Sequence, residues 1–224
     1  MTKITFYEQV GIIIPGALFL FGLLLYFPSL RELLVSGGFT VGELGIYLLL
    51  SYAAGNLVAA CANLAETLLW PLGGGMPTNW VTKSETTLIS GQQRELLEKR
   101  MSSRLGIKVN DIRGINSQVW WPISRQLYSE VVRHGKPERI DIFNGNYGLN
   151  RGLAAACFLL ACVSALEQRW WPCTFLAFAT AIYGYRAYRF AIHYGRELYL
   201  EFLVLGDTTT ANSTPEQKVT TKES

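Results

Sequence analysis

The sequence contains few histidines, few cysteines and few charged residues for its length. Only two histidines, His134 and His193, occur in 224 residues, which excludes a metal site built from several histidines. The four cysteines lack zinc or haem spacing and lie inside or at the edge of apolar segments, at Cys61, Cys157, Cys162 and Cys173. They indicate helix packing rather than a metal site or a disulfide framework.

Catalytic signatures are also missing. No serine lies in a nucleophile elbow, and no pair of carboxylates lies inside an apolar run. The Gly73-Gly74-Gly75 segment has no Gly-Lys-Ser/Thr sequence after it and no strand before it, which is typical of a hinge rather than a phosphate-binding loop. The net charge is only +3, with acidic and basic residues intermixed, which disfavours nucleic acid as a partner. We expect no metal and no cofactor, and a non-enzymatic role is favoured.

The apolar residues are gathered in blocks. Two charge-free runs of about 22 residues lie between Glu8 and Arg31 and between Glu43 and Glu66, and each can cross a hydrocarbon core of about 30 Å. Two shorter runs cover residues 152–166 and 170–185. They span a bilayer only if their helices continue past the flanking arginines, and a re-entrant hairpin is the alternative. The sequence predicts an all-α polytopic membrane protein with four transmembrane helices in two hairpins.

These spans divide the chain into four parts. The predicted parts are an N-terminal hairpin, 1–70, with spans at about 10–30 and 44–66; a small cytoplasmic helical domain, 71–138; a second hairpin, 139–206, with spans at about 148–166 and 170–188; and a disordered tail, 207–224.

The orientation follows from the distribution of basic residues. The short loops at Arg31 and Arg169 carry one basic residue each, whereas most Lys and Arg residues lie in the central region and after Tyr185. By the positive-inside rule, both termini and the central region are cytoplasmic. We expect a multi-pass protein of the bacterial inner membrane.

Local signals predict several helix boundaries. Pro15 predicts a kink or a fresh helix start within the first run. A capping box at Ser90 opens a helix that Gly106 stops. A second helix starts at Pro122 and closes at Gly135, and residues 107–115 between the two are expected to be extended.

Polar residues line one side of the second run. We call Tyr52, Asn56, Asn63 and Glu66 the polar stripe; they lie within about 40° of one line on a helix, beside Gly55 and Ala59. An amide in hydrocarbon needs a partner, so this side is expected to meet protein or water. It is either a helix-contact face, with small residues allowing close approach, or the lining of a cavity or oligomeric pore.

A basic face follows the fourth run. Arg186, Arg189, His193 and Arg196 share one side of the expected helix and suit anionic lipid headgroups. His193 and Glu197 are spaced to share a metal ion, but no third ligand is signalled nearby.

Several short motifs resemble a loose set of uncharacterised bacterial multispan inner-membrane proteins that are often found near anti-phage defence genes. The motifs are Phe6-Tyr7-Glu8 with Pro15-Gly16-Ala17, Tyr52-x-x-Gly55-Asn56, Gly75-Met76-Pro77-Thr78, and the asparagine-rich stretch from Arg139 to Gly152. The resemblance implies a membrane effector role. It brings no catalytic motif.

The leading hypothesis is a self-associating, non-enzymatic membrane scaffold or effector whose cytoplasmic domain receives a signal or a protein partner. Its partners are the lipid bilayer and further copies of itself. The alternative is a component of a transporter or membrane enzyme that holds a small ligand in a cavity between spans near Glu66. A pure membrane anchor is a third possibility.

Overall fold

The computed structural model describes residues 6–34 and 41–205, and all regular secondary structure in these residues is helical. The elements are α1 (Phe6–Tyr26), α2 (Pro28–Leu34), α3 (Val41–Leu72), the 3₁₀ helix η1 (Pro77–Thr82), α4 (Gly91–Leu105), α5 (Ser117–His134), α6 (Glu138–Leu166) and α7 (Trp170–Val204). The all-α part of the predicted fold is confirmed. The predicted tail lies outside the described residues.

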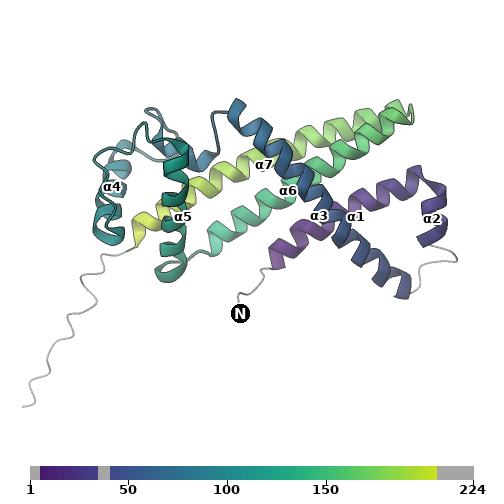
Figure 1. Ribbon diagram of the computed structural model, residues 1–224, viewed down its shortest axis with the longest axis horizontal. Coiled ribbons are helices and arrows are strands. Elements are labelled where there is room, and N and C mark those ends of the chain that lie inside the picture. The colour runs from purple at the N-terminus through teal and green to yellow at the C-terminus, as the bar shows by residue number, and fades with distance from the viewer. Residues whose placement is uncertain (1–5, 35–40, 206–224) are drawn as a thin grey trace, which may run out of the picture.

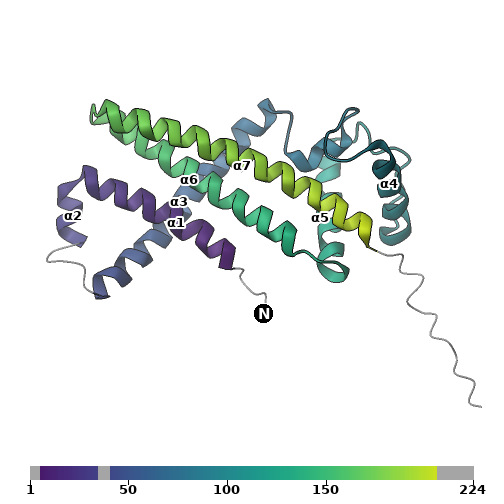
Figure 2. The same cartoon turned by 180° about the vertical axis from the view of Figure 1, so that it is seen from behind.

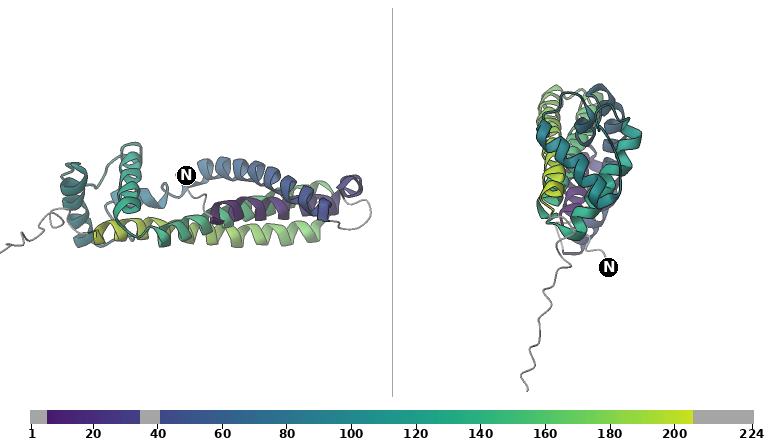
Figure 3. Two further views of the ribbon diagram at one scale, coloured as in Figure 1. Left: turned by 90° about the horizontal axis from the view of Figure 1, so that it is seen from below. Right: turned by 90° about the vertical axis from the view of Figure 1, so that its left-hand side faces the viewer.

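A long antiparallel hairpin of α6 and α7 runs through the molecule (Figure 1). Helix α1 lies alongside α6, and α3 crosses α1 and also touches α6 (Figures 1 and 2). Seen from the side, α3 forms a second layer over the layer of α1, α6 and α7, while α4 and α5 stand at one end (Figure 3). The chain therefore has an elongated helical part and a smaller helical end.

Two helices in the described residues are long and apolar enough to cross a membrane by length and composition, Val41–Pro71 and Glu138–Leu166. Helix α1 contributes a shorter apolar stretch, Val10–Tyr26. Only 17% of the most apolar window of α3 is buried inside the protein, which is unlike the core helix of a water-soluble domain. The exposed apolar surface of α3 therefore needs lipid or protein against it.

The last two helices extend well beyond their apolar runs. Helix α6 has 29 residues and continues through Arg151, and α7 has 35 residues and continues through Arg186. Both helices therefore continue past the flanking arginines, which is the condition that the sequence sets for these runs to span a bilayer. At 1.5 Å per residue, each helix is longer than the hydrocarbon core is thick.

Both boundaries of α4 are as predicted, and so is the end of α5 at Gly135, but the start of α5 is not. Ser90 and Gln93 form the capping box of α4, and Gly106 ends it in the left-handed conformation. Helix α5 begins at Ser117, because the side chain of Asn116 accepts a hydrogen bond from the amide of Gln118. Pro122 lies inside the helix rather than at its start. Residues 107–115 are irregular and form no strand.

Pro15 does not start a new helix, since α1 is continuous from Phe6 to Tyr26. The proline ring instead packs into a notch on α6. A Cβ atom built on Gly152 would lie 2.8 Å from Cγ of Pro15, which is closer than real side chains approach. The notch therefore fits the proline only because residue 152 is glycine.

The largest buried core lies at the end of the molecule that holds α4 and α5. Among its fully buried side chains are Leu97, Met101, Trp120, Leu127 and Val131 from the segment between α3 and α6. The end of α7 completes the same core with Leu198, Tyr199 and Phe202, and the start of α6 adds Ile140. The central segment thus forms its core together with the second hairpin.

Candidate functional site

Helix α3 packs on α1 through its smallest residues. Ser51, Gly55, Val58 and Ala62, which we call the small-residue face, are buried. A Cβ atom on Gly16 would lie 2.7 Å from Cα of Gly55, and one on Gly55 would lie 2.9 Å from the carbonyl carbon of Ile12. The two backbones meet where neither helix has a side chain, as in close helix pairs within membranes.

The polar stripe lies roughly a quarter turn away from the small-residue face. Asn56 and Asn63 are exposed, Tyr52 is 49% exposed, and Ala59 is half-buried. The amide nitrogen of Asn56 donates to the backbone carbonyl of Tyr52 at 2.8 Å. The structure therefore brings Gly55 into the contact between helices and leaves both asparagines on the outer surface of α3.

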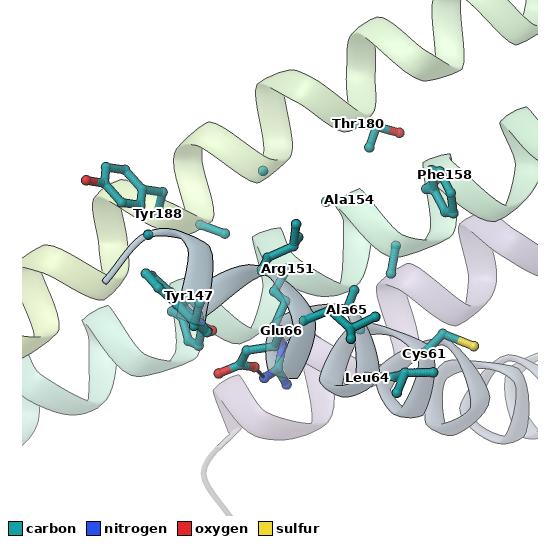
Figure 4. Close-up of a pocket in the computed structure, with 18 of the residues that line it drawn as sticks. Cys61, Leu64, Ala65, Glu66, Tyr147, Arg151, Ala154, Phe158, Thr180 and Tyr188 are labelled. Atoms are coloured by element: carbon teal, nitrogen blue, oxygen red, sulfur yellow. Dashed lines mark hydrogen bonds and ion pairs between the residues drawn. The ribbon is translucent and has the colours of Figure 1, made fainter. Parts of the chain in front are cut away.

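Glu66 is the one member of the polar stripe that meets another helix through an ion pair. Its carboxylate pairs with the guanidinium of Arg151 on α6 (Figure 4). The guanidinium carbon of Arg151 also lies 5.4 Å from the centre of the Tyr147 ring. The Tyr147 hydroxyl accepts a hydrogen bond from the indole nitrogen of Trp70 at 3.3 Å. These side chains link the end of α3 to the middle of α6.

A cavity of about 750 Å³ lies beside this ion pair, between the second half of α3 and the middle of α6 and α7. Its lining includes Leu64, Leu68 and Trp70 from α3, Ala154 and Phe158 from α6, and Thr180, Gly184 and Tyr188 from α7 (Figure 4). Nearly all lining groups are apolar. Glu66 also lines the cavity, whereas Tyr52, Asn56 and Asn63 do not.

Aromatic side chains gather at the end of the cavity nearest the α4–α5 region. The rings of Trp70 and Tyr188 stack with their centres 6.2 Å apart. Trp80 also packs against Tyr188, with the centres of the two rings 6.0 Å apart. Nζ of Lys83 lies 4.9 Å from the centre of the Trp80 ring. The cavity therefore has an aromatic and charged end and an apolar end.

The predicted basic face on α7 is only partly open. Arg186 and Arg189 are exposed, and Nη1 of Arg189 donates to the Tyr185 hydroxyl at 3.3 Å. His193 stacks on Phe143 with ring centres 5.4 Å apart. Nη2 of Arg196, although exposed, donates to the backbone carbonyl of Thr87 at 3.1 Å. Of the three guanidinium groups and one imidazole on this face, two guanidinium groups, those of Arg186 and Arg189, are exposed without a bond to the backbone of another segment.

Neither metal binding nor a disulfide is supported by the geometry. Across residues 6–34 and 41–205, no group of three or more potential ligand side chains could hold a metal ion. Glu197 pairs with Arg139 at 3.0 Å rather than sharing a metal with His193. All four cysteines are free.

Arg151 and Tyr147 are the site residues that sequence reasoning did not identify. In the sequence, Arg151 is one of the arginines that flank the two shorter apolar runs, and Tyr147 lies in the asparagine-rich stretch from Arg139 to Gly152. The available signal was that Glu66 closes one apolar run and Arg151 opens another, since opposite charges at the ends of adjacent spans can pair. Sequence alone does not show that the two runs are adjacent.

The fold and site define an all-helical protein with two helices suited to a bilayer and an apolar cavity bordered by one ion pair. No family model, no curated protein and no solved structure matches the chain. The resemblance to bacterial multispan membrane proteins stays a prediction, and function has to be argued from the geometry.

Proposed function

We propose that this chain is a multi-pass protein of the bacterial inner membrane whose helices α1, α3, α6 and α7 all cross the bilayer. Most of the exposed large apolar side chains belong to these helices, including Phe21 on α1, Leu57 on α3, Phe158 on α6 and Phe175 on α7. Soluble monomers rarely expose so much continuous apolar surface. A lipid environment removes it from water.

The arrangement of helix ends supports two hairpins in one orientation. Helix α2 and the turn between α6 and α7 lie at one end of the molecule (Figure 1). The start of α1 and the end of α3 point back toward the end where α4 and α5 lie (Figure 1). Together with the excess of Lys and Arg in the central region, this favours a cytoplasmic α4–α5 region and cytoplasmic termini.

We further propose that the protein self-associates through the polar stripe of α3. The observation that carries this proposal is that Asn56 and Asn63 are exposed on a helix whose surface is mostly apolar. An amide in hydrocarbon is unfavourable unless it forms hydrogen bonds. The same two residues of a second copy supply both donors and acceptors, as interhelical asparagines do in membranes. In this arrangement the α4–α5 region receives the signal or partner protein that activates the assembly.

The test compares two double variants of the full chain in native membranes. Asn56→Leu with Asn63→Leu removes the amides, while Leu50→Ala with Leu57→Ala changes a different exposed side of α3. We expect chemical cross-linking to give a ladder of oligomers for the wild type and the leucine-to-alanine control, and monomer for the asparagine variant. A monomeric wild type, or an unchanged ladder in the asparagine variant, contradicts self-association through this face.

The topology has its own test. Reporters that are active only in the periplasm are fused at the C-terminus and at Gln168 in the turn between α6 and α7. We expect activity at Gln168 and none at the C-terminus. Activity at the C-terminus, or release of the chain from membranes by alkaline carbonate, contradicts the four-span topology.

A second candidate function is supported by the cavity beside Glu66. The sequence hypothesis of a transporter or membrane-enzyme component requires a pocket within one chain, and the cavity of about 750 Å³ meets that requirement. Its volume falls in the range of about 300–1,000 Å³ that is typical of small-ligand sites.

A further inference from the structure

We propose that the cavity between α3, α6 and α7 binds an anionic phospholipid from the surrounding bilayer, with an acyl chain in the apolar part and the headgroup at Arg151. The proposal deepens the ligand-binding function above and rests on the proposed membrane location. The cavity's shape, its position and the charges at its aromatic end support it.

The cavity is shaped to hold a flexible apolar chain. Small residues on α6 and α7, among them Ala154, Ala155, Gly184 and Ala187, leave space that larger side chains would fill. A Cβ atom on Gly184 would meet nothing within 4 Å. On the α3 side, Leu64 and Leu68 line the cavity yet are each 64% exposed. The apolar part is therefore continuous with the exposed surface of α3, and a lipid can enter from the side.

The cavity lies where a phospholipid would need it. Its lining spans the last turns of α3 and the middle of α6 and α7. Tyr147 and Tyr188 lie at one end of it, and Phe158 and Thr180 lie at the other (Figure 4). Trp70, Tyr147 and Tyr188 form the aromatic end, and such side chains favour the boundary between headgroups and hydrocarbon. The acyl chain then extends from the boundary into the membrane.

The charges at the aromatic end favour an anionic headgroup. Arg151 pairs with Glu66 through Nη1, and its Nε is buried without a hydrogen-bond partner in the described residues. A second cation, Lys83, is not a lining residue but lies close to this end, because its Nζ is 4.9 Å from the centre of the Trp80 ring, which packs on the lining residue Tyr188. Two cations and one carboxylate leave a net positive charge. The phosphate group of a lipid headgroup neutralises this positive charge, and its oxygens accept hydrogen bonds from the guanidinium of Arg151.

The first test fills the cavity at a position that has room. The full chain is inserted into vesicles of equal parts phosphatidylglycerol and phosphatidylethanolamine and extracted in mild detergent. Native mass spectrometry then measures how much lipid stays bound to each protomer. We expect the wild type to retain one phosphatidylglycerol per protomer and Gly184→Phe to retain about tenfold less, equivalent to about 1.4 kcal/mol. Gly45→Phe is the matched control, because a Cβ atom there also meets nothing within 4 Å and lies outside the cavity.

The second test addresses the headgroup. Glu66→Gln with Arg151→Gln removes both charges of the ion pair without leaving one of them unpaired. We expect this variant to lose the preference for phosphatidylglycerol over phosphatidylethanolamine, while Arg133→Gln, on an exposed side chain of α5 outside the cavity, keeps it.

Three results overturn the proposal: a lipid-free wild type, equal retention by Gly184→Phe, or equal retention of the two lipids by the wild type. Cross-linking of the same preparations separates this failure from that of the proposed function. An embedded and oligomeric but lipid-free chain contradicts only the lipid site. A chain that alkaline carbonate releases contradicts both the lipid site and the proposed membrane location. If the wild type retains no lipid and Gly184→Phe loses the oligomers, a second copy of the chain occupies the cavity instead.

Discussion

At the scale of single residues, one buried hydrogen-bonded cluster ties the end of α7 to the segment between α3 and α6. The indole nitrogen of Trp120 donates to the Thr78 carbonyl and contacts the Tyr199 hydroxyl, each at 3.0 Å. The Tyr199 hydroxyl in turn donates to the Thr78 carbonyl. Both rings are fully buried. An unpaired polar group at this depth would cost about 1–3 kcal/mol, so the cluster requires all three groups together.

The cluster predicts a loss of stability at alkaline pH. Burial raises the pKa of Tyr199 well above its ordinary value of 10.0, and the hydrogen bond from Trp120 offsets only part of this shift. Because the unfolded chain releases the phenol proton first, stability is fully present below pH 10 and falls as pH rises toward the folded-state pKa. We expect the melting temperature of the wild type to fall more steeply above pH 10 than that of Tyr199→Phe. Parallel pH profiles of the two proteins would contradict this assignment.

At the scale of helices, the packing of α3 is decided by the size of its side chains rather than by their polarity. Ser51 and Gly55 of the small-residue face lie on α1, and Ala62 of the same face lines the cavity. The polar stripe, apart from Glu66, lies on the outside. Two backbones that approach closely gain dispersion contacts along the whole crossing, and this requires glycine at the point of contact. An asparagine at that point would hold the helices apart.

Alanine substitutions at two glycines of α3 test this packing. Gly55→Ala places a methyl group 2.9 Å from the carbonyl carbon of Ile12, so the helices must shift. We expect it to lower the free energy of unfolding by about 1–3 kcal/mol. Gly45→Ala, where the new methyl group meets nothing within 4 Å, should raise it by up to about 1 kcal/mol because alanine favours helix. Both are measured by thermal unfolding of the full chain in detergent, and equal effects of the two variants would contradict the close contact.

At the scale of the whole molecule, the α4–α5 region depends on a distant part of the chain. Leu198, Tyr199 and Phe202 of α7 are fully or almost fully buried in its core. The central segment between α3 and α6 supplies part of this core, and Ile140 of α6 and the end of α7 supply the rest. The second hairpin therefore both crosses the proposed membrane and stabilises the α4–α5 region.

Two substitutions near the end of α7 test this dependence. Phe202 is fully buried and Val204 is 76% exposed. We expect Phe202→Ala to cost about 3–5 kcal/mol and to speed hydrogen exchange throughout α4 and α5. Val204→Ala should leave that exchange unchanged. If Phe202→Ala altered exchange only within α7, the α4–α5 region would be independent of it.

The agreement between sequence and structure depends on how local each signal is. Ser90, Gln93 and Gly106 bound α4 as predicted, because capping involves only residues within one turn. The start of α5 at Ser117 was missed, since the capping side chain of Asn116 outweighs the preference of Pro122 for a first turn. The sequence predicts a kink or a fresh helix start at Pro15; α1 does not start again there, and the proline ring packs into the notch at Gly152, which is distant in sequence. The partner of Glu66 was missed for the same reason.

The sequence by itself determined that the chain is helical, that α3 and α6 carry enough apolar residues for a bilayer, and where local caps end α4. These properties depend on composition and on neighbours within a turn. Only the tertiary structure decided which side of α3 meets α1, that Glu66 pairs with Arg151, and that α7 completes the core beside α4 and α5. Each of these depends on contacts between residues far apart in the chain, for which single-sequence periodicity carries no signal.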